Sequence, residues 1–233
     1  MKQTRNLLVL SAIALSTGLF VACGGGTSSA ESEAASIPTD GLLGELPKVV
    51  AEYYAAEAAA SAKYDELKAS DPEKANAFWT DYISQGNTTK YKKETLPAVS
   101  KALEGIEIPT EIGEQLPMKL NGNFVLDDKR EASVSGEFTE GASNDIQILT
   151  LKPVAFDSDG NAIAIGPRGI NFSDYPIKPG KTFSFGFFIS PDDYNAASWA
   201  KLQKIVILDR QGEAYKQAEE QIKAAKDAFK NKQ

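Results

Sequence analysis

Carboxylates are the side chains of this 233-residue chain best suited to catalysis, because it contains no histidine and a single cysteine. Without histidine, Ser-His-Asp and Cys-His nucleophilic catalysis are excluded, and zinc, copper and non-haem iron lack their usual ligands. We therefore predict no metal and no cofactor. The residue types that are present could still supply carboxylate catalysis, Ser-Lys catalysis or calcium binding, or no chemistry at all.

Two adjacent acidic pairs, Asp127-Asp128 and Asp192-Asp193, are the candidates for acid–base work. Neighbouring residues of an extended chain point to opposite sides, so neither pair is expected to share a proton. We interpret Asp127-Asp128 as a loop between strands. Ser190-Pro191 before the second pair indicates a helix start with Ser190 as N-cap, where acidic residues complement the helix dipole.

Two further patterns have both a chemical and a structural interpretation. Asp157, Asp159 and Asn161 alternate like calcium ligands, but the sixth and twelfth positions lack the glycine and glutamate of an EF-hand, which favours a hairpin turn. Ser198 and Lys201 have the spacing of Ser-Lys enzymes. The companion motifs of the penicillin-binding enzymes are missing from the sequence, which favours an ordinary helical turn.

Three aromatic residues, Tyr175, Tyr194 and Trp199, are the candidates for ligand binding. They fall in the least regular stretch of the chain, and aromatic rings on loops can stack on sugars or hold a protein partner. For Trp199 we favour the alternative that it fills the core. For Tyr175, which Asp174 and Pro176 flank, both interpretations stay open.

Residues 41–106 are predicted to be helical. Apolar residues recur every three or four positions from Leu46 to Leu67, and Asp71-Pro72 marks the start of a second helix. A third helical stretch contains Pro97, which should kink or restart it.

The tail, residues 212–233, has the same helical spacing. A helix of this length is marginal alone, so its apolar stripe needs a partner. We predict that it packs on the helical region, with a partner outside the chain as the alternative.

Between residues 116 and 209 the apolar period changes to two, as in Ala132 to Phe138. Pro153 interrupts an apolar run there and indicates a bulge or an edge strand. Short strands, frequent turn residues and no long helix between them predict an antiparallel β-sandwich. The predicted fold class is therefore α+β.

The N-terminus has the pattern of an export signal. Lys2 and Arg5 precede an uncharged run, Leu7 to Phe20, that is shorter than the roughly 18 residues needed to span a bilayer. Small residues then lead to Cys23. We predict a signal peptide over residues 1–22 and, after the cysteine, a flexible Gly- and Ser-rich tether over residues 23–40.

This N-terminal pattern resembles the lipobox signal of bacterial lipoproteins, although Phe20 stands where leucine is usual. The resemblance implies that Cys23 carries fatty acyl chains, becomes the new N-terminus and anchors the protein to a membrane. Gly24 is not the aspartate that retains lipoproteins at the inner membrane in some bacteria, so the outer membrane is the favoured location. A cleaved signal without lipid is the alternative.

The segment 116–209 resembles the immunoglobulin-like β-sandwich modules common in bacterial envelope lipoproteins. The resemblance rests on the turn from Asp157 to Asn161 between two strands and on Pro179-Gly180-Lys181 before Thr182-Phe183-Ser184-Phe185. It implies a fold and no particular activity, because these modules have varied functions.

A net charge of −7 makes nucleic acid an unfavourable partner. We therefore predict a non-enzymatic, membrane-anchored envelope lipoprotein that binds or scaffolds an envelope protein or glycan. One alternative is a carboxylate-dependent glycan-acting enzyme, which needs two acids about 5–10 Å apart in a cleft. The other is a transporter-associated solute-binding lipoprotein, which needs a deep pocket between domains.

Overall fold

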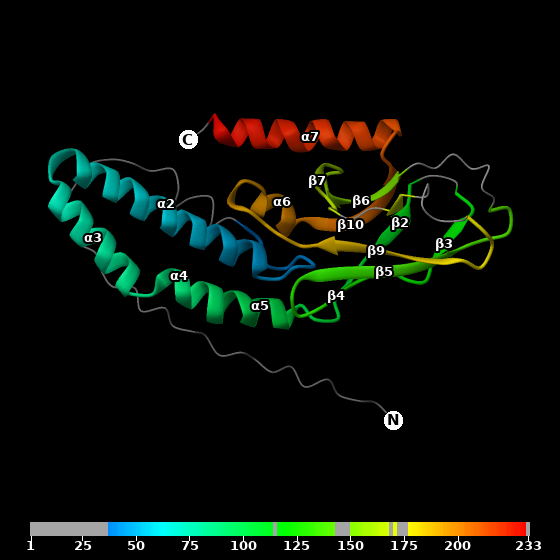
Figure 1. The fold of residues 1–233 in the computed structure, drawn as a ribbon, viewed down its shortest axis with the longest axis horizontal. Coiled ribbons are helices and arrows are strands. Elements are labelled where there is room, and N and C mark those ends of the chain that lie inside the picture. Colours follow the sequence, from blue (N-terminus) through cyan, green and yellow to red (C-terminus); the bar gives the residue numbers. More distant parts are fainter. Residues whose placement is uncertain (1–36, 114–115, 143–149, 168–169, 172–176, 232–233) are drawn as a thin grey trace, which may run out of the picture.

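The computed structural model describes residues 37–113, 116–142, 150–167, 170–171 and 177–231, and these form an α+β fold. Two helices, α2 (Leu46–Ser70) and α3 (Pro72–Ser84), make a hairpin that extends away from two β-sheets (Figure 1). We call this hairpin the helical arm. Asp71 begins α3 as predicted, because its side chain accepts the Lys74 N–H at 3.1 Å.

The predicted restart at Pro97 is confirmed. A short helix, α4 (Asn87–Lys90), leads into a π-helical turn, η1 (Tyr91–Thr95), and then into α5 (Leu96–Ala102). Pro97 is the second residue of α5 and has no N–H to donate to the preceding turn. The wider π turn accommodates this missing bond and connects the two α-helical segments.

Sheet A contains β1 (Glu107–Ile108), β4 (Phe124–Leu126), β5 (Glu131–Phe138) and β9 (Thr182–Phe188), in that order. A further strand, β3 (Met118–Leu120), lies in line with β4 along the same edge of β5. All described pairings in this sheet are antiparallel.

Sheet B contains β2 (Thr110–Ile112), β10 (Leu202–Asp209), β6 (Thr150–Asp157) and β7 (Ala162–Ile165), with β8 (Ile170–Asn171) also beside β6. The sandwich differs from the prediction in two ways: its first strands precede residue 116, and β2 runs parallel to β10. Pro153 lies in β6 between the residues that pair with β7 and those that pair with β8, so this edge of β6 is interrupted there, as proline requires.

The two sheets face each other across one hydrophobic core. Side chains of β5 alternate between exposed and buried, which places one face of sheet A against sheet B. The largest fully buried side chains that the two sheets supply to this core are Ile108, Phe124 and Phe185 from sheet A and Leu151, Ile205 and Ile207 from sheet B. The immunoglobulin-like assignment stays a prediction.

Helix α7 (Glu213–Lys230) packs on the outer face of sheet B, above β7 and β10 (Figure 1). We predicted that it would pack on the helical region. Instead, Tyr215 and Ala218 form a second cluster with Val154, Val206 and Leu208 of the sheet. The outer face of sheet B is apolar, and the stripe of α7 covers it.

No helix in the described part of the chain is long and apolar enough to cross a membrane.

Candidate binding site

Both acidic pairs are used to build turns. The Asp127 carboxylate accepts the backbone N–H groups of Lys129 and Glu131, each at 2.8 Å, in the hairpin between β4 and β5. Asp192, rather than the predicted Ser190, is the N-cap of a 3₁₀ turn, η3 (Asp193–Asn195), because its backbone N–H and side chain form a capping box with Asn195.

The turn interpretation of Asp157 is confirmed. Its buried carboxylate accepts the backbone N–H groups of Asp159 and Asn161 at 3.0 and 2.8 Å. Lys201 pairs with Asp159 at 2.9 Å, so this ammonium group is engaged by a carboxylate. In the ranges that the structure covers, no group of acidic or cysteine residues is arranged to hold a metal ion.

The predicted aromatic candidates do not form one site. Trp199, in helix α6 (Ala196–Ala200), is a core residue with 1 % of its surface exposed and an edge contact with Phe187. Tyr194, which belongs to η3, is half-buried against Phe229 and Lys226 of α7. Tyr175 and Cys23 lie outside the described residues.

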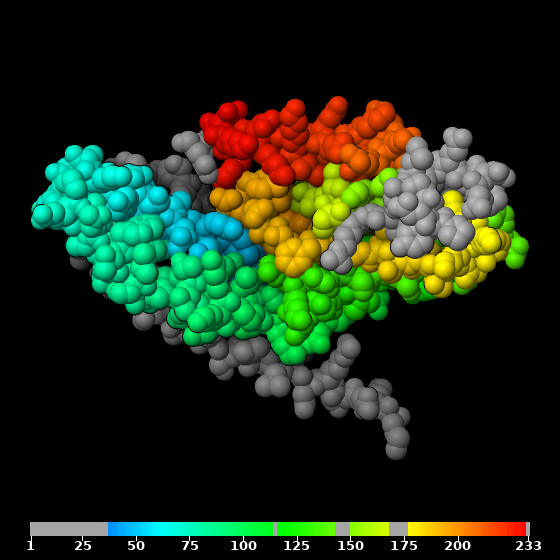
Figure 2. Space-filling model, in the orientation of Figure 1, coloured from blue at the N-terminus to red at the C-terminus, as the bar shows by residue number. Residues whose placement is uncertain are grey.

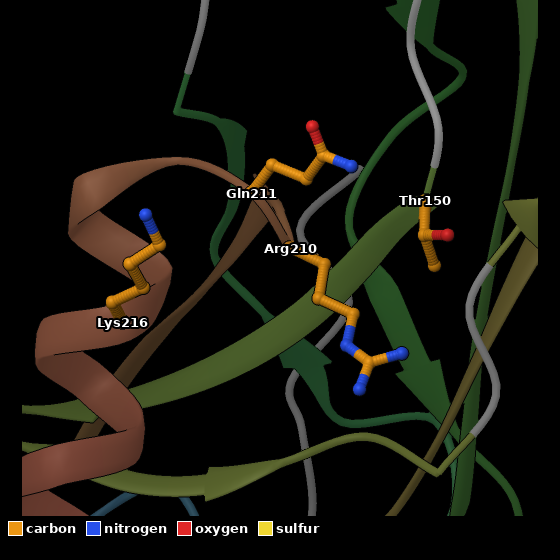
Figure 3. Close-up of a pocket in the computed structure, with 4 residues that line it drawn as sticks. All are labelled: Thr150, Arg210, Gln211 and Lys216. Atoms are coloured by element: carbon orange, nitrogen blue, oxygen red, sulfur yellow. The ribbon is translucent and has the colours of Figure 1, made fainter.

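A shallow, open depression lies where β10 turns into α7, and Figure 3 shows its four lining residues: Thr150, Arg210, Gln211 and Lys216. It lies at one end of sheet B, where the Arg210 N–H donates to the Thr150 carbonyl at 2.9 Å. The depression is not the deep pocket between domains that a solute-binding lipoprotein needs.

A more promising surface combines two sets of contacts, one between tyrosines of α2 and η1 and one at the adjoining ends of β5 and β9, and the charge of Arg130 in the second set acts on Tyr91 in the first. We call it the aromatic junction; it consists of Tyr53, Tyr54, Tyr91, Arg130 and Phe188. In Figure 2 the blue start of α2 lies between the green segment that contains α5 and the gold segment that contains α6. Tyr54 and Phe188 are 38 % and 40 % exposed, so both rings offer apolar surface to a ligand.

The rings of the junction are held by direct stacking. Tyr53 and Tyr91 are parallel, with ring centroids 3.8 Å apart, and Tyr54 contacts Tyr53 edge-on at 5.5 Å. The guanidinium carbon of Arg130 lies 5.0 Å from the centre of the Phe188 ring.

A hydrogen-bond network fixes the arm side of the junction. The Tyr53 hydroxyl donates to Thr88 at 3.4 Å, and the Glu57 carboxylate accepts from the hydroxyls of Thr88 and Tyr82 at 3.0 and 2.8 Å. Burial and the Glu57 carboxylate raise the pKa of Tyr82 to about 12. Helices α2, α3 and α4 are thereby tied together beside Tyr53.

Arg130 owes its position to an uncommon backbone conformation. Its φ of 68° is left-handed, and no other described residue except glycine has a positive φ. The hairpin from Asp127 to Arg130 requires this conformation, since the Arg130 N–H donates to the Asp127 carbonyl. Glycine or asparagine is the usual choice at such a position.

The junction has a positive end and a negative end. Burial lowers the pKa of Arg130, and the Tyr91 charge acts in the opposite direction. No described carboxylate forms an ion pair with Arg130. At the other end, burial raises the pKa of Tyr54, and the charges of Asp192 and Asp193 raise it further. Tyr91 lies between them: burial raises its pKa, the Tyr54 charge raises it further, and the Arg130 charge acts in the opposite direction.

The aromatic junction was not predicted, although its sequence and its backbone each carry a local signal. Tyr53-Tyr54 and Phe187-Phe188 are adjacent aromatic pairs, and in a helix or strand both members of such a pair cannot face the core equally. Arg130 occupies a left-handed hairpin position without the usual glycine. Neither signal reveals that the segments meet.

Comparisons with known protein families, with curated proteins and with solved structures found no match to this chain.

Proposed function

We propose that this protein is a lipid-anchored, non-enzymatic binding protein of the bacterial cell envelope, and that it holds its ligand on the aromatic junction. The observation that carries the binding role is the stacked cluster of Tyr53, Tyr54 and Tyr91, with the charge of Arg130 acting on Tyr91 and the Arg130 side chain in turn contacting Phe188. The N-terminal lipobox resemblance at Cys23 supports the anchoring. The predicted tether ended at residue 40, but Ile37 is buried against Ala196 and Ala200, so the folded body begins by residue 37. A tether over residues 23–36 would then carry that body at the membrane surface.

The polar groups of the junction support a binding role because the described residues leave them unused. The hydroxyls of Tyr54 and Tyr91 form no hydrogen bond with another described residue, and Arg130 forms no ion pair there. Water can reach these groups in the free protein, and a ligand that supplies hydrogen-bond partners would replace that water. Ring surface beside such groups gives both contact area and orientation.

The anchoring half of the proposal is tested with Cys23→Ser. We expect the wild-type chain, expressed in a bacterium that processes lipoproteins, to be recovered in the membrane fraction with an acyl mass on residue 23. The serine variant should lose the acyl mass and leave the membrane fraction, because a hydroxyl cannot form the thioether. A mature wild-type protein without acyl mass would contradict the anchoring.

The binding half is tested by capture from envelope extracts with the full-length protein. We expect Tyr54→Ser combined with Phe188→Ser to lose the captured material, because both changes remove exposed ring surface. The matched control is Ile83→Ser, which removes a 62 % exposed apolar side chain from α3, outside the junction. Equal capture by all three proteins would rule out the junction as the binding surface.

A further inference from the structure

Strand β9 leaves one long edge of sheet A without a partner. It is a strand of seven residues that pairs with β5 along one side (Figure 1). Along its other side, no described strand pairs with it. An unpaired edge presents a row of backbone N–H and C=O groups, and these groups can bind the backbone of another strand. The free side of β9 is therefore a potential docking edge for an extended segment.

The hydrogen bonds at the two ends of β9 show which of its backbone groups point away from β5. The Phe138 N–H donates to the Lys181 carbonyl at 3.0 Å. The Ile189 N–H donates to the Arg130 carbonyl at 2.9 Å. In an antiparallel pair, residues that bond to the neighbouring strand alternate with residues that do not. The even-numbered residues of β9 therefore direct their N–H and C=O groups outward, and among the described residues these groups have no hydrogen-bond partner: Thr182, Ser184, Gly186 and Phe188.

The surface beside this edge is open. The side chains of Thr182, Ser184 and Phe188 are exposed. A β-carbon added to Gly186 would meet no other atom within 4 Å. The centre of β9 is therefore accessible to a second strand on the side that points away from β5.

The other edges of the two sheets are protected, and the edge of β9 is not. Proteins usually shorten, charge or cover an edge strand, which prevents unwanted pairing. Strands β1, β2, β3 and β8 have only two or three residues each, and β7 has four and lies against α7. The seven residues of β9 include no charged residue and no proline. An unprotected edge of this length indicates a strand that pairs with it.

We propose that β9 pairs with β9 of a second copy of this chain, antiparallel and about a two-fold axis at Phe185. This register places Thr182 opposite Phe188 of the second copy and Ser184 opposite Gly186 of the second copy. An interface of this symmetry uses the same surface twice, so the surface must be complementary to itself. Strand β9 meets this condition because the pairing brings no like charges together.

The inward-facing side chains of β9 favour a second copy over a foreign strand. Phe185 and Phe187 are buried in the core, and Phe183 packs against it. In the proposed register Phe183 lies opposite Phe187 of the second copy, and Phe185 lies opposite its own counterpart. These are the positions without hydrogen bonds, where opposed side chains lie closest, and aromatic pairs across strands are stabilising. A second copy supplies this row of rings by its own sequence.

The pairing goes beyond the proposed function and does not rest on it. A strand added at the edge extends sheet A in its own plane. The outer face of the sheet, to which the Phe188 ring belongs, therefore stays open to a ligand. The lipid anchor is not needed for the pairing.

The first test measures the mass of the full-length protein by sedimentation in detergent, with micelles in large excess so that two chains share a micelle only when they bind. We expect the wild-type chain to dimerise over a range of about 1–100 μM. Ser184→Pro should weaken dimerisation at least about tenfold, because proline lacks the N–H that Ser184 directs outward. Ser135, opposite Ser184 on β5, bonds to the Asn121 N–H on the far side, so β5 loses no bond.

Thermal unfolding and a charged variant separate loss of pairing from loss of fold. Ser184→Pro should unfold close to the wild-type temperature, because an edge strand tolerates proline where the N–H faces outward. Ser184→Lys should also weaken dimerisation, since it places two like charges close to the two-fold axis. Its matched control is Ser133→Lys, which adds the same charge to the same outer face on β5, one strand away from the edge, and should dimerise as the wild type does.

Disulfide formation tests the register in chains that also carry Cys23→Ser, so that no other thiol is present. Opposed residues of a hydrogen-bonded pair have Cα atoms about 5.5 Å apart, a separation that a disulfide can bridge. A mixture of Ser184→Cys and Gly186→Cys chains should therefore form a covalent dimer much faster than either chain alone.

Two results would overturn the pairing of β9 with a second copy. One is a wild-type protein that stays monomeric over the whole concentration range; if it captures a different envelope protein through β9, the edge belongs to a foreign strand. The other is unchanged dimerisation in both Ser184→Pro and Ser184→Lys. Acylation of Cys23 and capture through Tyr54 and Phe188 are measured separately, so either result leaves the proposed function standing.

Discussion

Trp199→Ala is expected to destabilise the protein by about 3–5 kcal/mol, the usual cost of removing a large aromatic side chain from a packed core. Trp199 is 1 % exposed, belongs to the cluster shared by both sheets and contacts the Phe187 ring edge-on at 6.2 Å. Neighbouring backbone cannot collapse easily into the space, because α6 is itself wedged against α2. For a chain of this length the loss corresponds to a melting temperature lower by about 10 °C, measured by calorimetry.

Two variants make this result specific to the core position. Trp79→Ala removes the other tryptophan, which is half-buried on the arm against Tyr64 and Tyr82, and should lower the melting temperature much less. Trp199→Phe should also cost less than the alanine variant, since it retains an aromatic ring and removes a buried indole N–H that has no hydrogen-bond partner among the described residues. A melting temperature for Trp199→Ala close to that of Trp79→Ala would contradict the core assignment.

Deletion of residues 212–233 is expected to destabilise the sandwich by on the order of 5 kcal/mol and to make it aggregate. Without α7, the buried side chains of Val154, Val206 and Leu208 would face water. The deletion also removes the Gln221 side chain, which accepts the Ala162 backbone N–H of β7 at 2.8 Å. Unfolding in denaturant and light scattering measure the two effects.

A shorter truncation provides the control for the tail. Ending the chain after Lys223 retains Tyr215, Ala218 and Ile222, the residues that cover sheet B, and removes the turns that reach Tyr194. This variant should remain soluble and lose far less stability. If both truncations behave alike, or if neither changes the unfolding midpoint, the cover provided by α7 is not needed.

Local signals in the sequence predicted local structure well. Asp71-Pro72 specifies a helix start through its own side chain and ring, and Pro97 interrupts a helix wherever that helix packs. The turn at Asp157 depends on a carboxylate and two backbone donors within five residues. These features need no knowledge of distant contacts.

Features that depend on distant contacts were not predicted. The stripe of α7 fits an apolar sheet face as well as another helix, so spacing alone does not determine its partner. The parallel pairing of β2 with β10 joins segments far apart in the chain. The aromatic junction likewise combines residues that are far apart in the chain, from Tyr53 to Phe188. Trp199, by contrast, was predicted to fill the core, and it is buried there.

The helical arm has almost no interior of its own. Beyond the first turns of α2, the side chains buried in its two helices are those of Ala60 and Ala75, and the aromatic contacts between them are half-exposed. Its far end is therefore the part of the molecule that opens most readily, while its near end is clamped by the Glu57 network and the tyrosine stack. A ligand held on Tyr53 or Tyr54 would therefore add contacts at the clamped near end of the arm, about 25 Å along α2 from its far end at Ser70.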